Sequence, residues 1–335
     1  MNWAKSGAVL IFLMLAMWSQ AQTGVPAFAN ALASPAAVSA AVPVPSGVPA
    51  DSTDSDSVVT IKKRVDEVHL IFIATDKHGK FVRDLTQSDF SILDDNKPPQ
   101  SIANFQHQTG LPLNLGLLVD TSGSVRSRFD FEQQAVIGFL QNTIRPKFDQ
   151  AFVMGFNQEP HITQDYTDNP ALLAAGVQKL HNGGGTAIYD AIYDACKQRL
   201  AKPENDRPQR RAIVLVSDGE DNQSQVTQAQ AIEIAQRAEV IIYAISTDDS
   251  GLVLRGDRVL EQLADATGGR AFFPFKMKDI KNSFAAIEDE LRSQYEISYH
   301  PADFAANGQY RPIQITALNK GLQVRARKGY YAPRQ

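Results

Sequence analysis

The sequence predicts an α/β fold in which a doubly wound, mostly parallel sheet is inserted in a small β-sandwich formed by strands from both ends of the chain. Between residues 111 and 290, short apolar runs alternate with helical periodicity. Repeated strand–helix units require right-handed crossovers and a parallel, Rossmann-like sheet. The segments on either side read as short strands and turns. The first of them has about fifty residues, which is marginal for an independent core, so it needs partner strands from the C-terminus.

The N-terminus predicts a secretory signal peptide over residues 1–21. Lys5 precedes an apolar stretch, residues 8–18, that is too short to span a bilayer, and Ala21 ends a small-residue cleavage signal. Ala29 ends a second possible cleavage site. We therefore expect an exported protein, located in the periplasm, the cell envelope or outside the cell, with no stable membrane span after cleavage; a retained, membrane-tethered N-terminus is the alternative.

Residues 22–57 are rich in Ala, Pro, Ser and Asp and cannot bury enough apolar surface to order themselves, which predicts a disordered linker. The remaining domains are then a discontinuous β-sandwich, residues 58–110 plus 291–335, and an inserted α/β domain, residues 111–290. Across the chain, 33 basic and 37 acidic residues give a net charge of −4, so no large positive field points to nucleic acid as a partner. The single cysteine, Cys196, cannot form an intramolecular disulfide.

The sandwich strands are expected where apolar and β-branched residues gather between turn signals. Expected strands lie near residues 65–72, 90–93, 295–299, 310–318 and 322–327. Residues 76–79 are expected to form a hairpin turn, and residues 319–321 a tight turn between the last two strands.

In the inserted domain, buried strands are expected at residues 114–119, 151–156, 212–217 and 240–246. Helices are expected at residues 125–142, 171–180, 187–200, 227–237 and 258–266, with a last helix at 278–292 that leads back to the sandwich.

The first of these strands ends in an oxygen-rich turn, Asp120-Thr-Ser-Gly-Ser124. Ligands of open α/β sheets bind at the carboxyl ends of the strands, so Asp120, Ser122 and Ser124 can converge on one point. Their hard oxygen donors suit Mg²⁺, Mn²⁺ or Ca²⁺ rather than Zn²⁺. However, Asp, Ser and Gly are also what an ordinary strand-to-helix connection uses, with Ser as the N-cap.

Two further oxygen-rich turns favour the functional interpretation. Gly183-Gly-Gly-Thr186 and Ser217-Asp218-Gly-Glu-Asp221 both lie where the α/β chain changes element. Three glycines let the backbone bring Thr186 close to a metal without side-chain clashes. Glu220 and Asp221 either add to the negative field of the crevice or are ordinary solvated turn residues.

In order and spacing, these three turns resemble the metal-ion-dependent adhesion site (MIDAS) of von Willebrand factor type A (VWFA) domains, over roughly residues 111–290. The flanking segments, residues 84–90, 291–295 and 324–333, resemble those of the bacterial exported "VWFA-related domain" proteins abundant in Acidobacteria. The resemblance implies that Ser122 and Ser124 ligate a divalent cation directly. Asp120, Thr186 and Asp218 would act directly or through water.

The resemblance also implies a function. The cation, Mg²⁺ with Mn²⁺ or Ca²⁺ as alternatives, would keep one position open for an Asp or Glu carboxylate of a partner protein. The expected function is an exported, divalent-cation-dependent, adhesion-type binding module. The alternative is a structural or assembly module of the cell envelope, in which the metal only stabilises the loops.

Enzymatic interpretations fit the sequence less well, and we expect no catalytic activity. Asp120-Thr-Ser-Gly differs from the aspartic protease motif by an extra Ser, and no second copy completes a carboxylate pair. Ser122 lacks the flanking glycines of a nucleophile elbow. The glycine turn at 183–185 lacks the Lys-Ser/Thr of a phosphate-binding loop.

Overall fold

The computed structural model describes residues 67–107, 110–126, 128–201, 209–248, 250, 252–274, 276 and 279–334, which belong to one compact unit. The predicted signal peptide and linker, and the start of the first β segment, lie outside the described residues.

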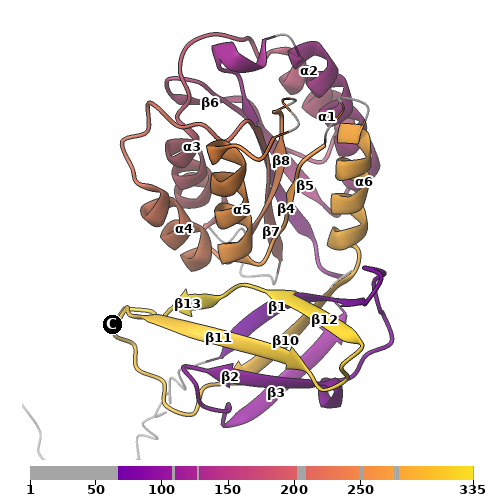
Figure 1. The fold of residues 1–335 in the computed structure, drawn as a ribbon, viewed down its shortest axis with the longest axis vertical. Helices are drawn as coiled ribbons and strands as arrows, with labels where there is room; N and C mark the ends of the chain where they lie inside the picture. The colour runs from indigo at the N-terminus through magenta and orange to yellow at the C-terminus, as the bar shows by residue number, and fades with distance from the viewer. Residues whose placement is uncertain are drawn as a thin grey trace, which may run out of the picture. The chain divides into compact units, whose positions relative to one another are not determined.

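The inserted domain is built on a six-stranded sheet with the order β6-β5-β4-β7-β8-β9 (Figure 1). Its strands are β4 (Leu113–Asp120), β5 (Gln150–Phe156), β6 (Pro160–Thr167), β7 (Arg210–Ser217), β8 (Val240–Ser246) and β9 (Ala271–Phe272). All neighbours pair in parallel except β5 and β6. All eight residues of β4 are buried, as expected for a strand covered on both faces. The doubly wound, mostly parallel sheet is confirmed.

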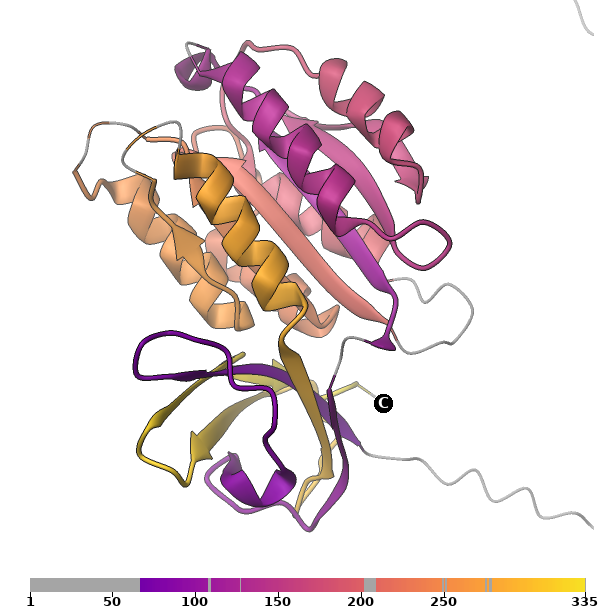
Figure 2. The same ribbon diagram turned by 90° about the vertical axis from the view of Figure 1, so that its right-hand side faces the viewer.

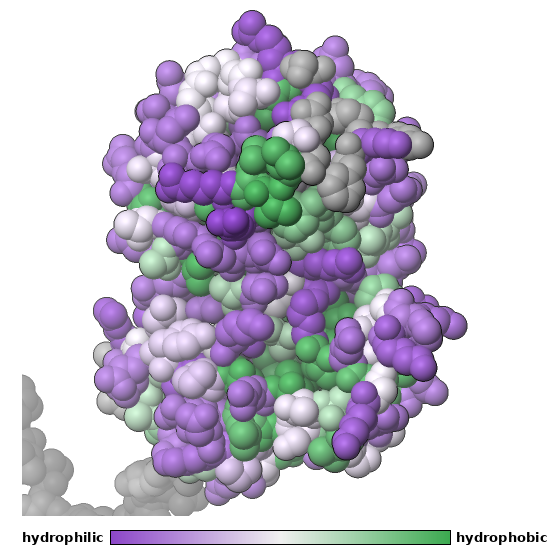
Figure 3. All heavy atoms as spheres, in the orientation of Figure 1, coloured by the Kyte–Doolittle hydropathy of each residue, from purple (hydrophilic) through white to green (hydrophobic). Residues whose placement is uncertain are grey.

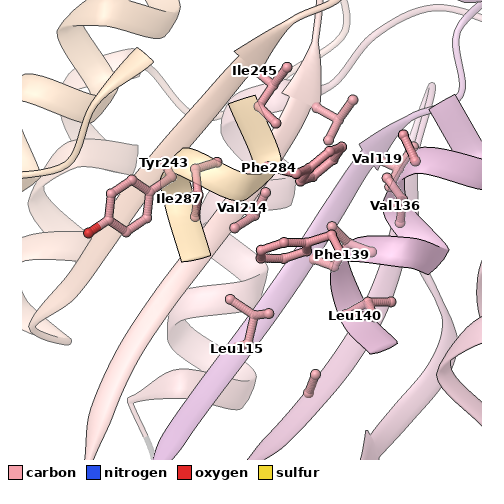
Figure 4. Close-up of a cluster of buried hydrophobic side chains, with 14 of the residues drawn as sticks. Leu115, Val119, Val136, Phe139, Leu140, Val214, Tyr243, Ile245, Phe284 and Ile287 are labelled. Atoms are coloured by element: carbon pink, nitrogen blue, oxygen red, sulfur yellow. The ribbon is translucent and has the colours of Figure 1, made fainter. Parts of the chain in front are cut away.

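Helices cover both faces of this sheet (Figure 1). They are α1 (Phe129–Thr143), α2 (Pro170–Gln178), α3 (Ile188–Asp194), α4 (Gln228–Arg237), α5 (Arg255–Thr267) and α6 (Ile280–Leu291). The apolar residues of α1, α2 and α6 pack on one face, and those of α3, α4 and α5 on the other. On the first face Phe139 of α1 stacks on Phe284 of α6, with ring centroids 4.9 Å apart, against Val214 of the sheet (Figure 4).

Several elements differ from the expected ones. The edge strands β6 and β9 were not predicted, because β6 is polar and β9 has only two residues. Helix α1 starts at Phe129 because a 3₁₀ turn, Gly123–Val125, comes first. The segment predicted as one helix at 187–200 is α-helical in α3 and continues as a π-helical turn, Ala195–Leu200.

Strands from both ends of the chain form the predicted sandwich of two antiparallel sheets, with orders β12-β1-β10-β3 and β13-β11-β2. Its strands are β1 (Val68–Asp76), β2 (Phe90–Asp94), β3 (Ser101–His107), β10 (Gln294–His300), β11 (Tyr310–Ala317), β12 (Leu322–Ala326) and β13 (Gly329–Tyr331); a short 3₁₀ helix, Gln87–Asp89, precedes β2. Between the sheets, Phe72 packs edge-to-face on Phe90 and stacks on Tyr295.

Both predicted turns of the sandwich form, but neither closes a regular hairpin. Gly79 adopts φ +79° and donates to the Asp76 carbonyl, after which the chain returns through a single bridge, Thr75 to Phe81. The turn at 319–321 joins β11 to β12, which belong to different sheets. It therefore folds the chain from one layer of the sandwich to the other.

Helix α6 leads into β10 after only two residues (Figure 2). Glu290, near the end of α6, forms an ion pair with Arg325 of β12. The Leu291 carbonyl accepts a hydrogen bond from Arg210 at the start of β7. Arg210 also donates to the side chain of Gln294 in β10, so these contacts join the sandwich to the amino-terminal edge of the sheet. No helix in the described part of the chain is long and apolar enough to cross a membrane.

Candidate metal centre

The crevice is built where β4 and β7 end beside each other. Asp120 is the last residue of β4 and Ser217 the last of β7, and the strands pair in parallel up to this point. The Ser217 hydroxyl donates to Asp120 Oδ2 over 2.6 Å, and the Ser122 amide donates to Asp120 Oδ1 over 2.8 Å. Asp120 is fully buried, so these two bonds fix its carboxylate at the floor of the crevice.

Ser122, Ser124 and Asp218 meet above this floor. The 3₁₀ turn after Ser122 brings alternate side chains together, and the Oγ atoms of Ser122 and Ser124 are 2.9 Å apart. The Ser124 hydroxyl donates to Asp218 Oδ2 over 2.6 Å. Ser122 is buried, Asp218 half-buried and Ser124 exposed. The cluster therefore opens to solvent.

The glycine-rich loop at residues 183–186, here called the third loop, packs against the turn after β4, the first loop, through backbone hydrogen bonds. The Gly183 amide donates to the Thr121 carbonyl over 2.7 Å, and the Gly123 amide donates to the Gly184 carbonyl over 3.2 Å. Gly184 has φ +92°, a conformation that residues with a side chain rarely adopt. Thr186 follows in this loop and is 3% exposed. Among the described residues its hydroxyl makes no hydrogen bond to the other four predicted ligands, and its loop is joined to the turn after β4 by the two backbone bonds above.

Asn222 holds the third loop to the turn after β7. Its Oδ1 accepts a hydrogen bond from the Thr186 backbone amide over 3.0 Å, and the Asn222 backbone amide donates to the Thr186 carbonyl over 3.0 Å.

Gly219, in the same turn, has φ +78°, and a Cβ there would lie 2.2 Å from the Gly256 carbonyl oxygen. The backbone after Asp218 therefore runs against the start of α5, where only glycine fits.

The roles of Glu220 and Asp221, left open by the sequence, differ. The Asp221 carboxylate accepts hydrogen bonds from the Ile188 amide over 2.8 Å and from the Ser224 hydroxyl over 2.6 Å. It therefore satisfies an amide at the N-terminus of α3, which also favours a negative charge. Glu220 is exposed, as a solvated turn residue would be.

Two buried acidic side chains near the crevice, Asp120 and Glu132, have raised pKa values. Burial raises the pKa of Asp120 to about 6; hydrogen bonds from Ser217 and Ser122 oppose this shift, and the charge of Asp218 adds to it. Burial also raises the pKa of Glu132, in the first turns of α1, to about 8, although Arg128 opposes the change. Within the described part of the chain, both Glu132 carboxylate oxygens lack a hydrogen-bond partner and Asp120 forms no ion pair.

The donor set fits a hard divalent cation. No cluster of three or more His, Cys, Asp or Glu side chains occurs among the described residues, so a cation here would rely on hydroxyls and two carboxylates. Oxygen-only sets of this kind suit Mg²⁺, Mn²⁺ or Ca²⁺. Sequence reasoning placed Ser217 in an oxygen-rich turn but gave it no role of its own, and it missed Asn222 and Glu132, which carried no signal.

A doubly wound sheet with an oxygen-lined crevice at its carboxyl edge defines a class of α/β domains typified by the von Willebrand A fold. The sequence profile of the von Willebrand factor type A domain matches residues 114–290, more than half of the chain, and the chain belongs to this family. Domains of this family are usually binding modules without catalytic activity.

Among curated proteins the chain is similar to von Willebrand factor A domain-containing protein 3B from Homo sapiens, with 26% identity over 180 residues. The match covers 52% of this chain but only 13% of the human protein.

Three solved structures are similar in fold. Proximal thread matrix protein 1 from the mussel byssus, with a zinc-occupied MIDAS motif, is 16% identical (TM-score 0.47; 58% of this chain and 48% of that chain). The PilB minor pilin from Streptococcus sanguinis is 12% identical (TM-score 0.44; 59% and 63%). A von Willebrand factor type A protein from Catenulispora acidiphila is 13% identical (TM-score 0.46; 80% and 72%).

Proposed function

We propose that this chain is an exported, divalent-cation-dependent protein-binding module of the adhesion type, which binds a carboxylate of a partner protein. The proposed ligand set is Asp120, Ser122, Ser124, Thr186 and Asp218. The proposed cation is Mg²⁺, with Mn²⁺ and Ca²⁺ as alternatives. We also propose the domain boundaries, the signal peptide and the relationship to exported bacterial VWFA-related proteins that the sequence suggests.

One observation carries this proposal. The Ser122 and Ser124 hydroxyls and the Asp218 carboxylate form one hydrogen-bonded cluster that opens to solvent above the buried Asp120. A buried carboxylate without an internal counter-ion is costly, and an external cation offsets that cost. The arrangement therefore supports a cation site rather than a simple helix cap.

Four of the five residues have distinct parts in the proposed site. Ser122 and Ser124 would contribute neutral hydroxyl oxygens, and Asp218 would contribute a charged oxygen at the solvent side. Asp120, held by Ser217, would contribute its negative charge from below. When bound, the cation supplies an open coordination position for a partner carboxylate oxygen.

The alternative, a structural module in which the metal only stiffens the loops, is less well supported. The three loops are already joined by direct hydrogen bonds, from Gly183 to Thr121, from Gly123 to Gly184 and between Thr186 and Asn222. These bonds need no metal. Stabilisation of the loops by a metal therefore does not account for an open, acidic crevice.

Calorimetric titration of Mg²⁺ into the purified chain tests the site. Asp218→Ala removes a proposed ligand, and Glu220→Ala, two residues away on the exposed turn, is the matched control. We expect Asp218→Ala to abolish measurable Mg²⁺ binding and Glu220→Ala to retain it. At a Mg²⁺ concentration about 100 times Kd, the wild-type protein should gain about 2.7 kcal/mol in stability, and the Asp218 variant none. Unchanged affinity in Asp218→Ala would refute the site.

A further inference from the structure

An apolar hollow of about 600 Å³ lies at the same edge of the sheet as the crevice, where β8 and β9 end against α6. Its apolar lining includes Leu252, Val253, Phe272, Phe273, Pro274 and Ala286, and polar and charged side chains, among them Asp248, Arg270 and Asp279, complete the wall. Leu252 is 68% exposed and Val253 is 73% exposed. Figure 3 shows hydrophobic surface gathered near the start of α5 among hydrophilic surroundings. Exposed apolar residues clustered around a hollow, unlike single scattered ones, mark an interaction site.

The hollow lies beside the crevice, along the same edge of the sheet. Ser246 at the end of β8 pairs with Ser217 at the end of β7, and the Thr247 amide donates to the Ser217 carbonyl over 3.1 Å. The turn after Asp218 contacts the backbone of Gly256, which follows shortly after Leu252 and Val253 in the chain. The crevice lies between β4 and β7 and the hollow between β8 and β9. Two strand spacings therefore separate them, about 10 Å.

The loop that carries the apolar residues is held in place. The Asp257 carboxylate, which is buried, accepts a hydrogen bond from the Ser246 hydroxyl over 2.7 Å and another from the Leu254 amide over 3.0 Å. These bonds tie the start of α5 to the end of β8. Leu252 and Val253 thus directly precede an anchored position, Leu254.

We propose that the hollow takes an apolar side chain of the same partner segment whose carboxylate enters the crevice. This inference rests on the proposed function and specifies its partner. An extended segment rises about 3.3 Å per residue, so about three residues span the 10 Å between the two sites. The partner is therefore a protein segment with an acidic residue and, about three positions away, a large aliphatic or aromatic residue.

Interface size gives an independent reason for a second contact. A specific interface buries about 800 Å² on each partner, far more than one carboxylate can cover. Most binding energy comes from a few desolvated anchors, which are often aromatic or aliphatic side chains in pockets. Among the described residues at this edge, the hollow beside the crevice is the apolar site that can receive such an anchor.

A bead-displayed library of octapeptides, each with one fixed Asp and random residues elsewhere, tests the proposal on the purified chain. Selection with Mg²⁺ and counter-selection with chelator should enrich large apolar residues about three positions from the Asp. A control library with Asn in place of Asp should yield no Mg²⁺-dependent binders. Mg²⁺-dependent binders without any apolar preference would overturn this inference alone. Absence of Asp-dependent, Mg²⁺-dependent binding would refute the proposed function itself.

Substitutions of the exposed residues that line the hollow test whether the apolar side chain of the peptide binds there. Val253→Asp and Leu252→Asp change exposed side chains and should weaken a selected peptide about tenfold or more while leaving Mg²⁺ affinity unchanged. Leu318→Asp, at a 64% exposed leucine in the sandwich, is the matched control and should have no effect. Equal peptide affinity in wild type and Val253→Asp would contradict the proposal. So would a wild-type dimer that Val253→Asp dissociates, because a second copy would then be the occupant.

Discussion

Asp94 and Asp120 are both buried aspartates at the ends of strands, with 1% and 0% exposure, but their surroundings are opposite. In the sandwich, Asp94 accepts hydrogen bonds from the Tyr299 and Tyr330 hydroxyls and from Arg311, which lies 2.8 Å away. Its charge is paired inside the protein. Among the described residues, Asp120 receives hydrogen bonds from Ser217 and Ser122 alone, and burial raises its pKa to about 6.

The difference separates a structural carboxylate from one that is suited to a ligand. Asp94 lies in β2 of one sheet and Tyr299 in β10 of the other, so the network centred on Asp94 joins the two layers of the sandwich. Tyr330 belongs to β13, and its phenol pKa is raised by burial and by the Asp94 charge. In the part of the chain that the structure describes, no cationic side chain is paired with Asp120. A cation bound from solution would neutralise the charge of Asp120, as Arg311 neutralises the charge of Asp94 in the sandwich.

The largest expected effect comes from breaking the internal pair. Asp94→Asn leaves the Arg311 charge buried without its main partner and should cost about 3 kcal/mol of unfolding free energy. Urea denaturation measures this loss. Asp303→Asn removes the more exposed partner of the same arginine and should cost much less. In contrast, Asp120→Asn should not lower the stability of the metal-free protein near neutral pH, but should abolish Mg²⁺ binding. A large destabilisation by Asp120→Asn would remove the distinction between the two aspartates.

A second effect should appear in the pH dependence of stability. Glu132 has a folded-state pKa of about 8, above the usual value of 4.5. The folded state therefore holds this proton more tightly. The contribution of this proton to the free energy of unfolding is fully present below the pKa of Glu132 in the unfolded chain. It is lost as the pH rises towards the folded-state pKa of about 8. Relative to Glu132→Gln, the metal-free wild type should lose roughly 2 kcal/mol between pH 6 and pH 8.

Urea titrations in chelator, at several pH values, measure this difference. Other groups titrate in the same range, including His69, whose pKa is raised by its hydrogen bond to Glu296. Because both proteins share these groups, the difference between them reports on Glu132. If the plots of unfolding free energy against pH were parallel for wild type and Glu132→Gln, the pKa of Glu132 would not be raised in the folded protein.

The smallest effects concern the acidic residues after Asp218. Asp221 satisfies an amide at the start of α3, so Asp221→Ala should cost about 1 kcal/mol, the usual loss for a helix cap. Glu220→Gln should leave stability unchanged within error and weaken Mg²⁺ only slightly, as expected for an exposed charge. Thermal unfolding and calorimetry measure the two effects. If Glu220→Gln lost Mg²⁺ binding as Asp218→Ala is expected to, the ligand set would need revision.

Much of the fold was predictable because its signals are local. The buried strands β4, β5, β7 and β8 are continuous apolar runs, and the helices follow them with clear periodicity. Convergence of Asp120, Ser122, Ser124 and Asp218 followed from the rule that parallel strands end at a common edge. Strands β6 and β9 carried no such signal, since one is polar and the other very short.

The sequence by itself determined the alternation of strands and helices and the residues that gather at the carboxyl edge, because both follow from periodicity and from the direction of parallel strands. Only the tertiary structure decided which charges are paired. Asp94 and Arg311 lie 217 positions apart, and Asp120 and Ser217 lie 97 apart, so no local pattern relates them. Burial and hydrogen bonding depend on these distant partners. They give Asp94 an internal cation, Arg311, and leave Asp120 without one among the described residues.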